Sequence, residues 1–190
     1  MAINRVSQSS IQQAFPKFNT AWDGVSAVGG MDAISAFTLT ANTASVTFNN
    51  IPQTYTHLQI RTFAAATSAS SAIKVVLNTD TTGANYSRHM LYGNGSSNPA
   101  TSGTSAYIGP VFLSGTASIF SGGITDIHDY TNTNKYKPAR VLHGTDINSS
   151  GIIEIDSFVW LNTAAINSIQ LISDVGSFVT YSSFALYGIK

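Results

Sequence analysis

The sequence has no cysteine and few charged residues, and each shortage excludes a class of protein. The absence of cysteine excludes a disulfide framework, a thiolate metal site and a cysteine nucleophile. Charged residues make up 9% of the 190 residues, and nine basic residues balance nine acidic ones. The scattered lysines and arginines predict no nucleic-acid binding. A polar surface with so little charge favours self-association.

Long apolar runs are also missing. No run approaches the roughly 18 residues of a membrane span, and the first fifteen residues lack the apolar stretch of a signal peptide. We therefore expect a chain made in the cytoplasm that does not insert into a membrane. Walker, G-x-S-x-G and H-E-x-x-H motifs are absent as well, so we predict no enzyme, no cofactor and no metal site.

The first 33 residues differ from the rest because their large apolar residues show no strand alternation. We predict an extended N-terminal arm over 1–33, followed by a β-sandwich domain over 34–190. The arm either packs on its own domain or buries its anchors on a neighbouring subunit, since large aromatic side chains dominate interfaces. The predicted assembly anchors are Ile11, Phe15, Phe18 and Trp22.

From Ser35 onward apolar and polar residues alternate with a period of two, which predicts strands. In the segment 56–64, for example, Leu58 and Ile60 are expected on the buried face and Arg61 on the wet face. Ten short antiparallel strands favour an all-β, two-layer β-sandwich of jelly-roll type. The ten segments are 35–40, 44–50, 56–64, 72–78, 86–93, 117–130, 136–144, 151–161, 166–173 and 178–189.

The connections follow from turn-forming residues. The stretch 93–106 has almost no large apolar residue and is predicted to be a surface loop. Residues 82–85 and 148–151 are tight-turn sequences, the second of them typical of a hairpin.

Two polar groups invite a chemical interpretation. Asp126, His128 and Asp129 are a candidate metal or acid–base cluster, but the short D-x-H pattern lacks further ligands or a nucleophile. Glu154 and Asp156 face the same way on one strand at a spacing found in glycosidases. We interpret the first group as an exposed strand face and the second as a solvated edge.

A third oxygen-rich group lies in the turn sequence 78–86. Asn78, Asp80 and Asn85 offer oxygen ligands for Ca²⁺, but the D-x-D-x-D-G spacing of a calcium loop is missing. An Asx-type turn explains the same residues and is our prediction.

Five segments after residue 50 carry a resemblance to a known family: IPQTYTHLQIR (51–61), NTDTTGANYSRHMLYGNGSS (78–97), DIHDYTNTNKYK (126–137), LNTAAINSIQLI (161–172) and FVTYSSFALYGIK (178–190). Together they resemble a module of tailed-bacteriophage virion proteins, especially those of cyanobacterial and marine phages. The start of the chain is similar to leaders that precede this module.

The resemblance implies a non-enzymatic virion structural protein, a decoration (cement) or fibre-type subunit attached through its arm. It further implies localisation in the virion, other capsid or tail subunits as partners, and a homo-oligomer that the analogy makes a homotrimer. The resemblance is compatible with a position on the head, the neck or the tail of the particle.

A host-glycan-binding module of a tail or head fibre is the alternative. Aromatic side chains stack on sugars, and six tyrosines are expected at strand ends or in loops, where a sandwich lectin places its site. Tyr92, Tyr107 and Asn94, beside the loop 93–106, are the predicted glycan contacts. The six tyrosines are Tyr55, Tyr86, Tyr92, Tyr107, Tyr130 and Tyr136.

Overall fold

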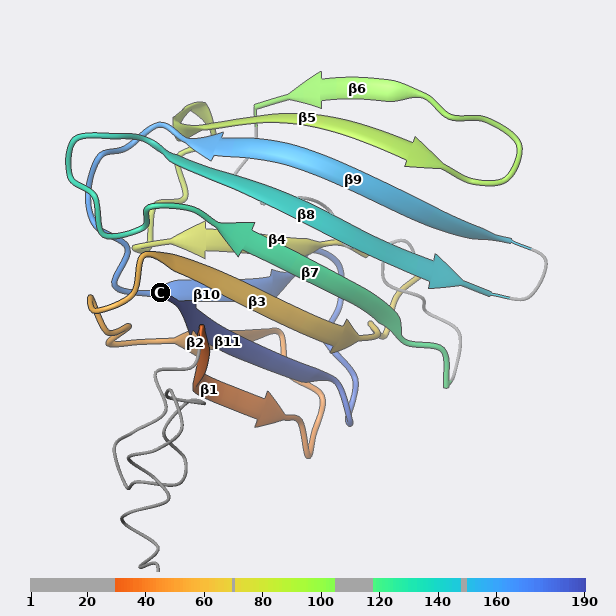
Figure 1. The fold of residues 1–190 in the computed structure, drawn as a ribbon. Coiled ribbons are helices and arrows are strands. Elements are labelled where there is room, and N and C mark those ends of the chain that lie inside the picture. Colours follow the sequence, from red (N-terminus) through yellow and green to blue (C-terminus); the bar gives the residue numbers. More distant parts are fainter. Residues whose placement is uncertain (1–29, 70, 105–117, 148–149) are drawn as a thin grey trace, which may run out of the picture. The chain divides into compact units, whose positions relative to one another are not determined.

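Eleven β-strands and one short 3-10 turn make up the regular structure, and no α-helix occurs in the described part of the chain. The structure is a computed structural model that describes residues 30–69, 71–104, 118–147 and 150–190 (Figure 1). The all-β prediction is confirmed for these residues. The strands are β1 (Met31–Thr38), β2 (Ser45–Phe48), β3 (His57–Ala64), β4 (Ile73–Leu77), β5 (Tyr86–Gly93), β6 (Ala100–Gly103), β7 (Ser121–Ile127), β8 (Lys137–Asp146), β9 (Gly151–Trp160), β10 (Ile169–Ser173) and β11 (Ser183–Ile189).

Two antiparallel sheets contain these strands. The large sheet has eight strands in the order β1-β11-β3-β7-β8-β9-β5-β6, and the small sheet has three in the order β2-β10-β4. One hydrophobic cluster contains side chains from both sheets, so the sheets pack face to face (Figure 1). The predicted two-layer β-sandwich is therefore present, with layers of unequal width.

The core fills the space between the inner faces of the two sheets. Leu58 and Ile60 of β3 and Phe184 of β11 line it from the large sheet, and Leu77 of β4 and Leu171 of β10 line it from the small one. Each is at most 1% exposed. The predicted alternation of β3 is confirmed, because Leu58 and Ile60 are buried and Arg61 is exposed.

Each of the ten predicted segments overlaps a strand, and the eleventh strand was missed. Strand β6 lies inside the stretch 93–106 that the sequence predicts to be a loop. All four of its residues are exposed and small, and β6 pairs with β5 at the edge of the sheet. The sequence of β6 shows no alternation of apolar and polar residues, because this strand is held by backbone hydrogen bonds, which any residue can form.

The compact unit of the structure is Met31–Lys190, and β1 begins at Met31, inside the predicted arm. The anchors Ile11, Phe15, Phe18 and Trp22 lie outside the described residues.

The connection between β4 and β5 is the predicted Asx-type turn. The Asp80 carboxylate accepts hydrogen bonds from the backbone N–H of Thr82 (3.0 Å), from Asn85 Nδ2 (2.8 Å) and from Trp160 Nε1 (2.8 Å). Burial acts to raise the pKa of Asp80, but these hydrogen bonds outweigh it and hold the pKa below its ordinary value. Asn78 is engaged elsewhere, with the backbone of residues 165–168. The three residues therefore do not form one oxygen cage.

Candidate functional site

Strand β9 buries acidic side chains and exposes aliphatic ones, the reverse of the usual arrangement. Glu154 and Asp156 are 0% and 1% exposed, whereas Ile153 and Ile155 are 60% and 56% exposed. Alternate side chains of a strand share one face, so the two carboxylates lie on the same inner face as the core residue Trp160. The prediction of a solvated edge is wrong, because β9 lies between β8 and β5 and both carboxylates are inside.

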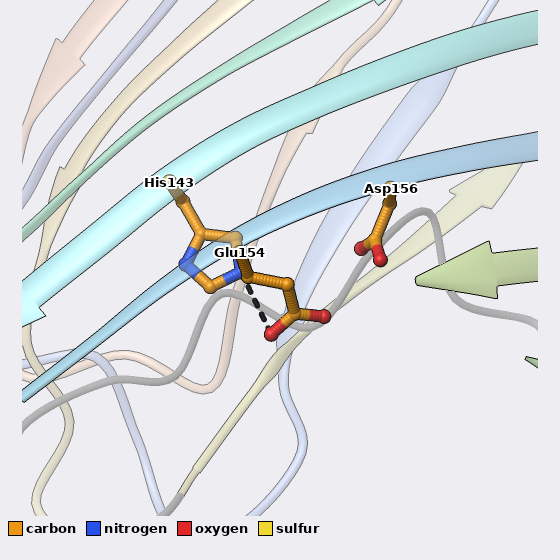
Figure 2. Close-up of side chains that lie close together, drawn as sticks. All are labelled: His143, Glu154 and Asp156. Atoms are coloured by element: carbon orange, nitrogen blue, oxygen red, sulfur yellow. Dashed lines mark ion pairs between the residues drawn. The ribbon is translucent and has the colours of Figure 1, made fainter. Parts of the chain in front are cut away.

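His143 of β8 joins the two carboxylates in a buried polar cluster (Figure 2). His143 is paired with Glu154 across the two strands, and its Nε2 atom is 3.1 Å from Glu154 Oε2. Within the described ranges this is the one group of three His, Asp or Glu residues whose ligand-type atoms all lie within 4.8 Å of one another. We call His143, Glu154 and Asp156 the buried polar cluster.

The pKa of Asp156 is strongly raised by its surroundings in the cluster. Burial raises its pKa most, the neighbouring Glu154 carboxylate raises it further, and the positive charge of Arg88 lowers it, with a result of about 8. Apart from each other and His143, the two carboxylates have no hydrogen-bond partner among the described residues. Near neutral pH and without another cation, the Asp156 carboxyl therefore holds a proton.

The chemistry open to this cluster is limited by its burial. All three side chains are at most 2% exposed, so no substrate in solution reaches them in this conformation. An imidazole and two carboxylates are donors suited to holding a cation or a shared proton.

The outer face of the large sheet shows the opposite anomaly, an exposed row of aliphatic side chains. Ile124 of β7, Leu142 of β8, Ile155 of β9 and Leu91 of β5 are direct cross-strand neighbours in that order. They are between 39% and 56% exposed. Single exposed apolar residues are ordinary, but four in contiguous register form a patch, which we call the apolar row.

A line of glycines runs beside the apolar row. In the next register position Gly122 of β7 and Gly144 of β8 lie between Phe63 of β3 and Ile153 of β9. A Cβ atom added at Gly122 would meet nothing within 4 Å, so this position is open. Gly144 and Ile153 also line a depression of about 610 Å³ beside the β8–β9 connection. We call the gap at Gly122 and Gly144 the glycine notch.

The predicted glycan contacts are not gathered on an exposed surface in the described residues. Tyr92 is half-buried and is the cross-strand neighbour of Glu154, on the inner face. The side-chain oxygen of Asn94 accepts hydrogen bonds from Ser96 and Ser97 and so stabilises its own turn. Tyr107 lies outside the described residues. Tyr86 and Tyr130 are 0% exposed, so their rings are not available for stacking on a sugar.

The predicted Asp126, His128 and Asp129 group is divided between different partners. Asp126 accepts a hydrogen bond from Gln59 Nε2 at 2.8 Å, while Asp129 pairs with Lys135 at 3.1 Å. The His128 ring contacts the ring of His57 edge-on, at 5.2 Å between centroids. The three side chains therefore do not converge on one ion.

Sequence reasoning missed both features of β9, although a signal was present. Trp160 is a strong core residue, and counting back by twos from it places Asp156 and Glu154 inside and Ile155 and Ile153 outside. Counting two residues on from the core residue Val141 likewise places His143 on the inner face of β8.

Comparisons with protein-family models, with curated proteins and with solved structures gave no match for this chain. In the part of the chain that the structure describes, no helix combines the length and apolarity needed to span a bilayer. The structure thus defines an antiparallel β-sandwich protein with an exposed apolar row on the outer face of its large sheet.

Proposed function

We propose that this chain is a non-enzymatic structural subunit that associates with further copies of itself through the outer face of its large sheet. The observation that carries the proposal is the apolar row, whose four side chains are exposed in direct cross-strand register. Contiguous exposed apolar patches mark interaction surfaces. A chain with 9% charged residues has little charge repulsion to keep copies apart.

A second copy is the occupant that the shape of the face favours. A ridge, the apolar row, and a hollow, the glycine notch, lie side by side on one surface. Rotation of a second copy by a two-fold axis places the ridge of each copy against the notch of the other. The face is therefore complementary to itself.

The energy of this contact predicts weak affinity between two isolated copies. Complete burial of one aliphatic side chain contributes about 1.5–3 kcal/mol, so covering Phe63, Ile153 and the half-exposed apolar row contributes on the order of 6 kcal/mol. That gain is comparable to the entropy cost of association. We expect association that depends on concentration and becomes lasting in a multivalent particle.

A substitution that fills the glycine notch tests this proposal. We expect Gly122→Leu to fold normally, because the added side chain meets open space, and to weaken self-association at least about tenfold by blocking the ridge of the second copy. Sedimentation velocity of the full chain over a concentration series measures this. Gly103→Leu, also in open space but on edge strand β6, is the matched control and should associate like the wild type.

A wild-type chain that stays monomeric over the whole series would contradict the proposed function. Equal weakening by Gly122→Leu and Gly103→Leu would also contradict it, because the notch would then have no special part. The fitted stoichiometry distinguishes the two-fold pair favoured here from the trimer that the family resemblance implies.

We further propose that the sandwich is of jelly-roll type and that the assembly is a phage virion. A jelly roll pairs its first strand with its last and its last with its third in one sheet, and its second strand with its penultimate one in the other. The neighbours β1-β11-β3 and β2-β10 have that relation, which supports the jelly-roll assignment. The virion itself is supported by the resemblance of residues 51–190.

The arm provides a separate prediction. In this proposal residues 1–33 attach the subunit to its particle, as a decoration or fibre-type protein, through Ile11, Phe15, Phe18 and Trp22. Deletion of residues 1–25 should reduce incorporation into particles at least about tenfold while the sandwich stays folded. Quantitative immunoblots of purified particles measure incorporation. Unchanged incorporation would remove the arm as the anchor.

A further inference from the structure

We propose that the buried polar cluster is a structural binding site for a first-row divalent transition cation, with Zn²⁺ as the probe that fits its donors best. His143, Glu154 and Asp156 would supply one nitrogen and two carboxylate ligands. This goes beyond the assembly function and differs from the sequence-based expectation of no metal site.

The geometry brings the donors together from two adjacent strands. His143 and Glu154 are cross-strand partners on β8 and β9, and Asp156 follows Glu154 on the same face. Ligands bound to one Zn²⁺ at about 2.0–2.2 Å lie roughly 3–4 Å apart. The donor atoms here lie within 4.8 Å of one another, so small side-chain rotations bring all three onto one ion. In Figure 2 the two carboxylates and the imidazole are directed towards a common space.

The second observation is that the carboxylates have no partner outside the cluster. All four carboxylate oxygens of Glu154 and Asp156 are buried, Glu154 Oε2 lies 3.1 Å from His143 Nε2, and no described residue outside the cluster donates a hydrogen bond to either carboxylate. Buried carboxylates are normally paired or bind a metal, because an uncompensated buried charge is very unfavourable. The one imidazole of His143 contacts a single oxygen of Glu154, so two acidic groups in one buried space have more acceptor oxygens than the cluster has donors, and this excess points to a cation as the further partner.

The donor types select the class of cation. Ca²⁺ and Mg²⁺ prefer sites built from oxygen atoms alone, whereas an imidazole nitrogen with carboxylates suits Zn²⁺ and neighbouring transition ions. The two carboxylates supply two negative charges, which balance one divalent ion. Because the cluster is almost inaccessible, we expect the ion to enter during folding or local opening of the sheet.

The test refolds the full chain from denaturant with EDTA or with ZnCl₂ and then measures thermal unfolding and bound zinc. At free zinc about 100 times the Kd we expect the midpoint to rise by roughly 5–10 °C. Stoichiometric zinc should remain after desalting. Calcium and magnesium at the same concentration should produce no comparable shift.

Three variants connect the effect to the cluster. Asp156→Asn and His143→Gln should each weaken zinc binding by more than about 100-fold, since even residues that only support a metal ligand cost 10–100-fold. Asp156→Asn keeps the side-chain size and removes a buried ionisable group, so it should fold even if His143→Gln does not. Asp146→Asn, the same change at an exposed position of β8, should bind zinc like the wild type.

His128→Gln tests the separate surface contact between His57 and His128 and should leave the zinc response unchanged. The absence of a zinc-dependent shift in the wild type would overturn the proposal, as would an undiminished response in Asp156→Asn. In either case the buried polar cluster is not a zinc site. Self-association is measured independently, so failure here is distinguishable from failure of the assembly proposal.

Discussion

Trp160→Ala should lower the free energy of unfolding by about 4–5 kcal/mol, the largest loss that we expect from a single side chain. Trp160 is 1% exposed in the core, and truncation of a buried tryptophan leaves a large cavity. The change also removes the 2.8 Å hydrogen bond from Trp160 Nε1 to Asp80, which links the end of β9 to the β4–β5 turn. Because domains of this size have only about 5–15 kcal/mol in total, the variant should be close to unfolding.

Urea unfolding at fixed pH measures this loss. Two further variants separate the contribution of the hydrogen bond from that of core packing. Trp160→Phe keeps much of the packing and removes the hydrogen bond to a carboxylate, so it should lose about 1.5–3 kcal/mol. Val159→Ala, the adjacent half-buried position on the outer face of β9, should lose less than about 1 kcal/mol. Similar losses for Trp160→Ala and Val159→Ala would show that the Asp80–Trp160 link does not anchor the fold.

The zinc-free protein should lose stability as the pH rises from about 4 to about 8 because of Asp156. Its pKa is about 8 in the folded chain, against about 3.9 for an unfolded aspartate. Below pH 4 the carboxyl is protonated in both states. Between the two values the unfolded chain releases the proton and the folded chain keeps it, so unfolding becomes more favourable with each pH unit. The complete effect is on the order of 5 kcal/mol.

Asp156→Asn isolates this contribution because asparagine does not titrate. We expect the variant to be several kcal/mol more stable than the wild type at pH 8, and nearly equal to it at pH 4. Denaturant unfolding in EDTA over this range gives both curves. Asp146→Asn should follow the wild type. Parallel curves for wild type and Asp156→Asn would contradict the raised pKa.

The two proposed interactions have one structural origin, the orientation of β9. Turning this strand by one residue would place Ile153 and Ile155 in the core and expose Glu154 and Asp156 to water. Simple burial favours that arrangement, but Trp160 and its hydrogen bond to Asp80 hold the observed one. A partner for the outer face and a cation for the inner one would each compensate part of the resulting loss.

Several features could be predicted from the sequence because they depend on local patterns. Alternation with a period of two identified ten of the eleven strands, and turn-forming residues identified the Asp80 turn and the connection between β8 and β9. These features depend on the preferences of neighbouring residues, which do not require knowledge of the rest of the chain. The shortage of charge likewise indicated a surface that tolerates self-association.

Only the tertiary structure decided which face of each strand is covered and which distant residues meet. Alternation shows that Glu154 and Asp156 share a face, but the packing of the sheets determines that this face is the inner one. Lys137 is another case, because lysine is usually exposed, whereas Lys137 is buried and donates hydrogen bonds to three backbone carbonyl groups. Strand pairing assembles both sites: the apolar row joins strands between Leu91 and Ile155, and the buried polar cluster joins the consecutive strands β8 and β9. The parity of β8 and β9 indicates which of their residues share a face, but local propensity carries no information about which strands pair, and so the sites proposed here become complete only in the folded chain.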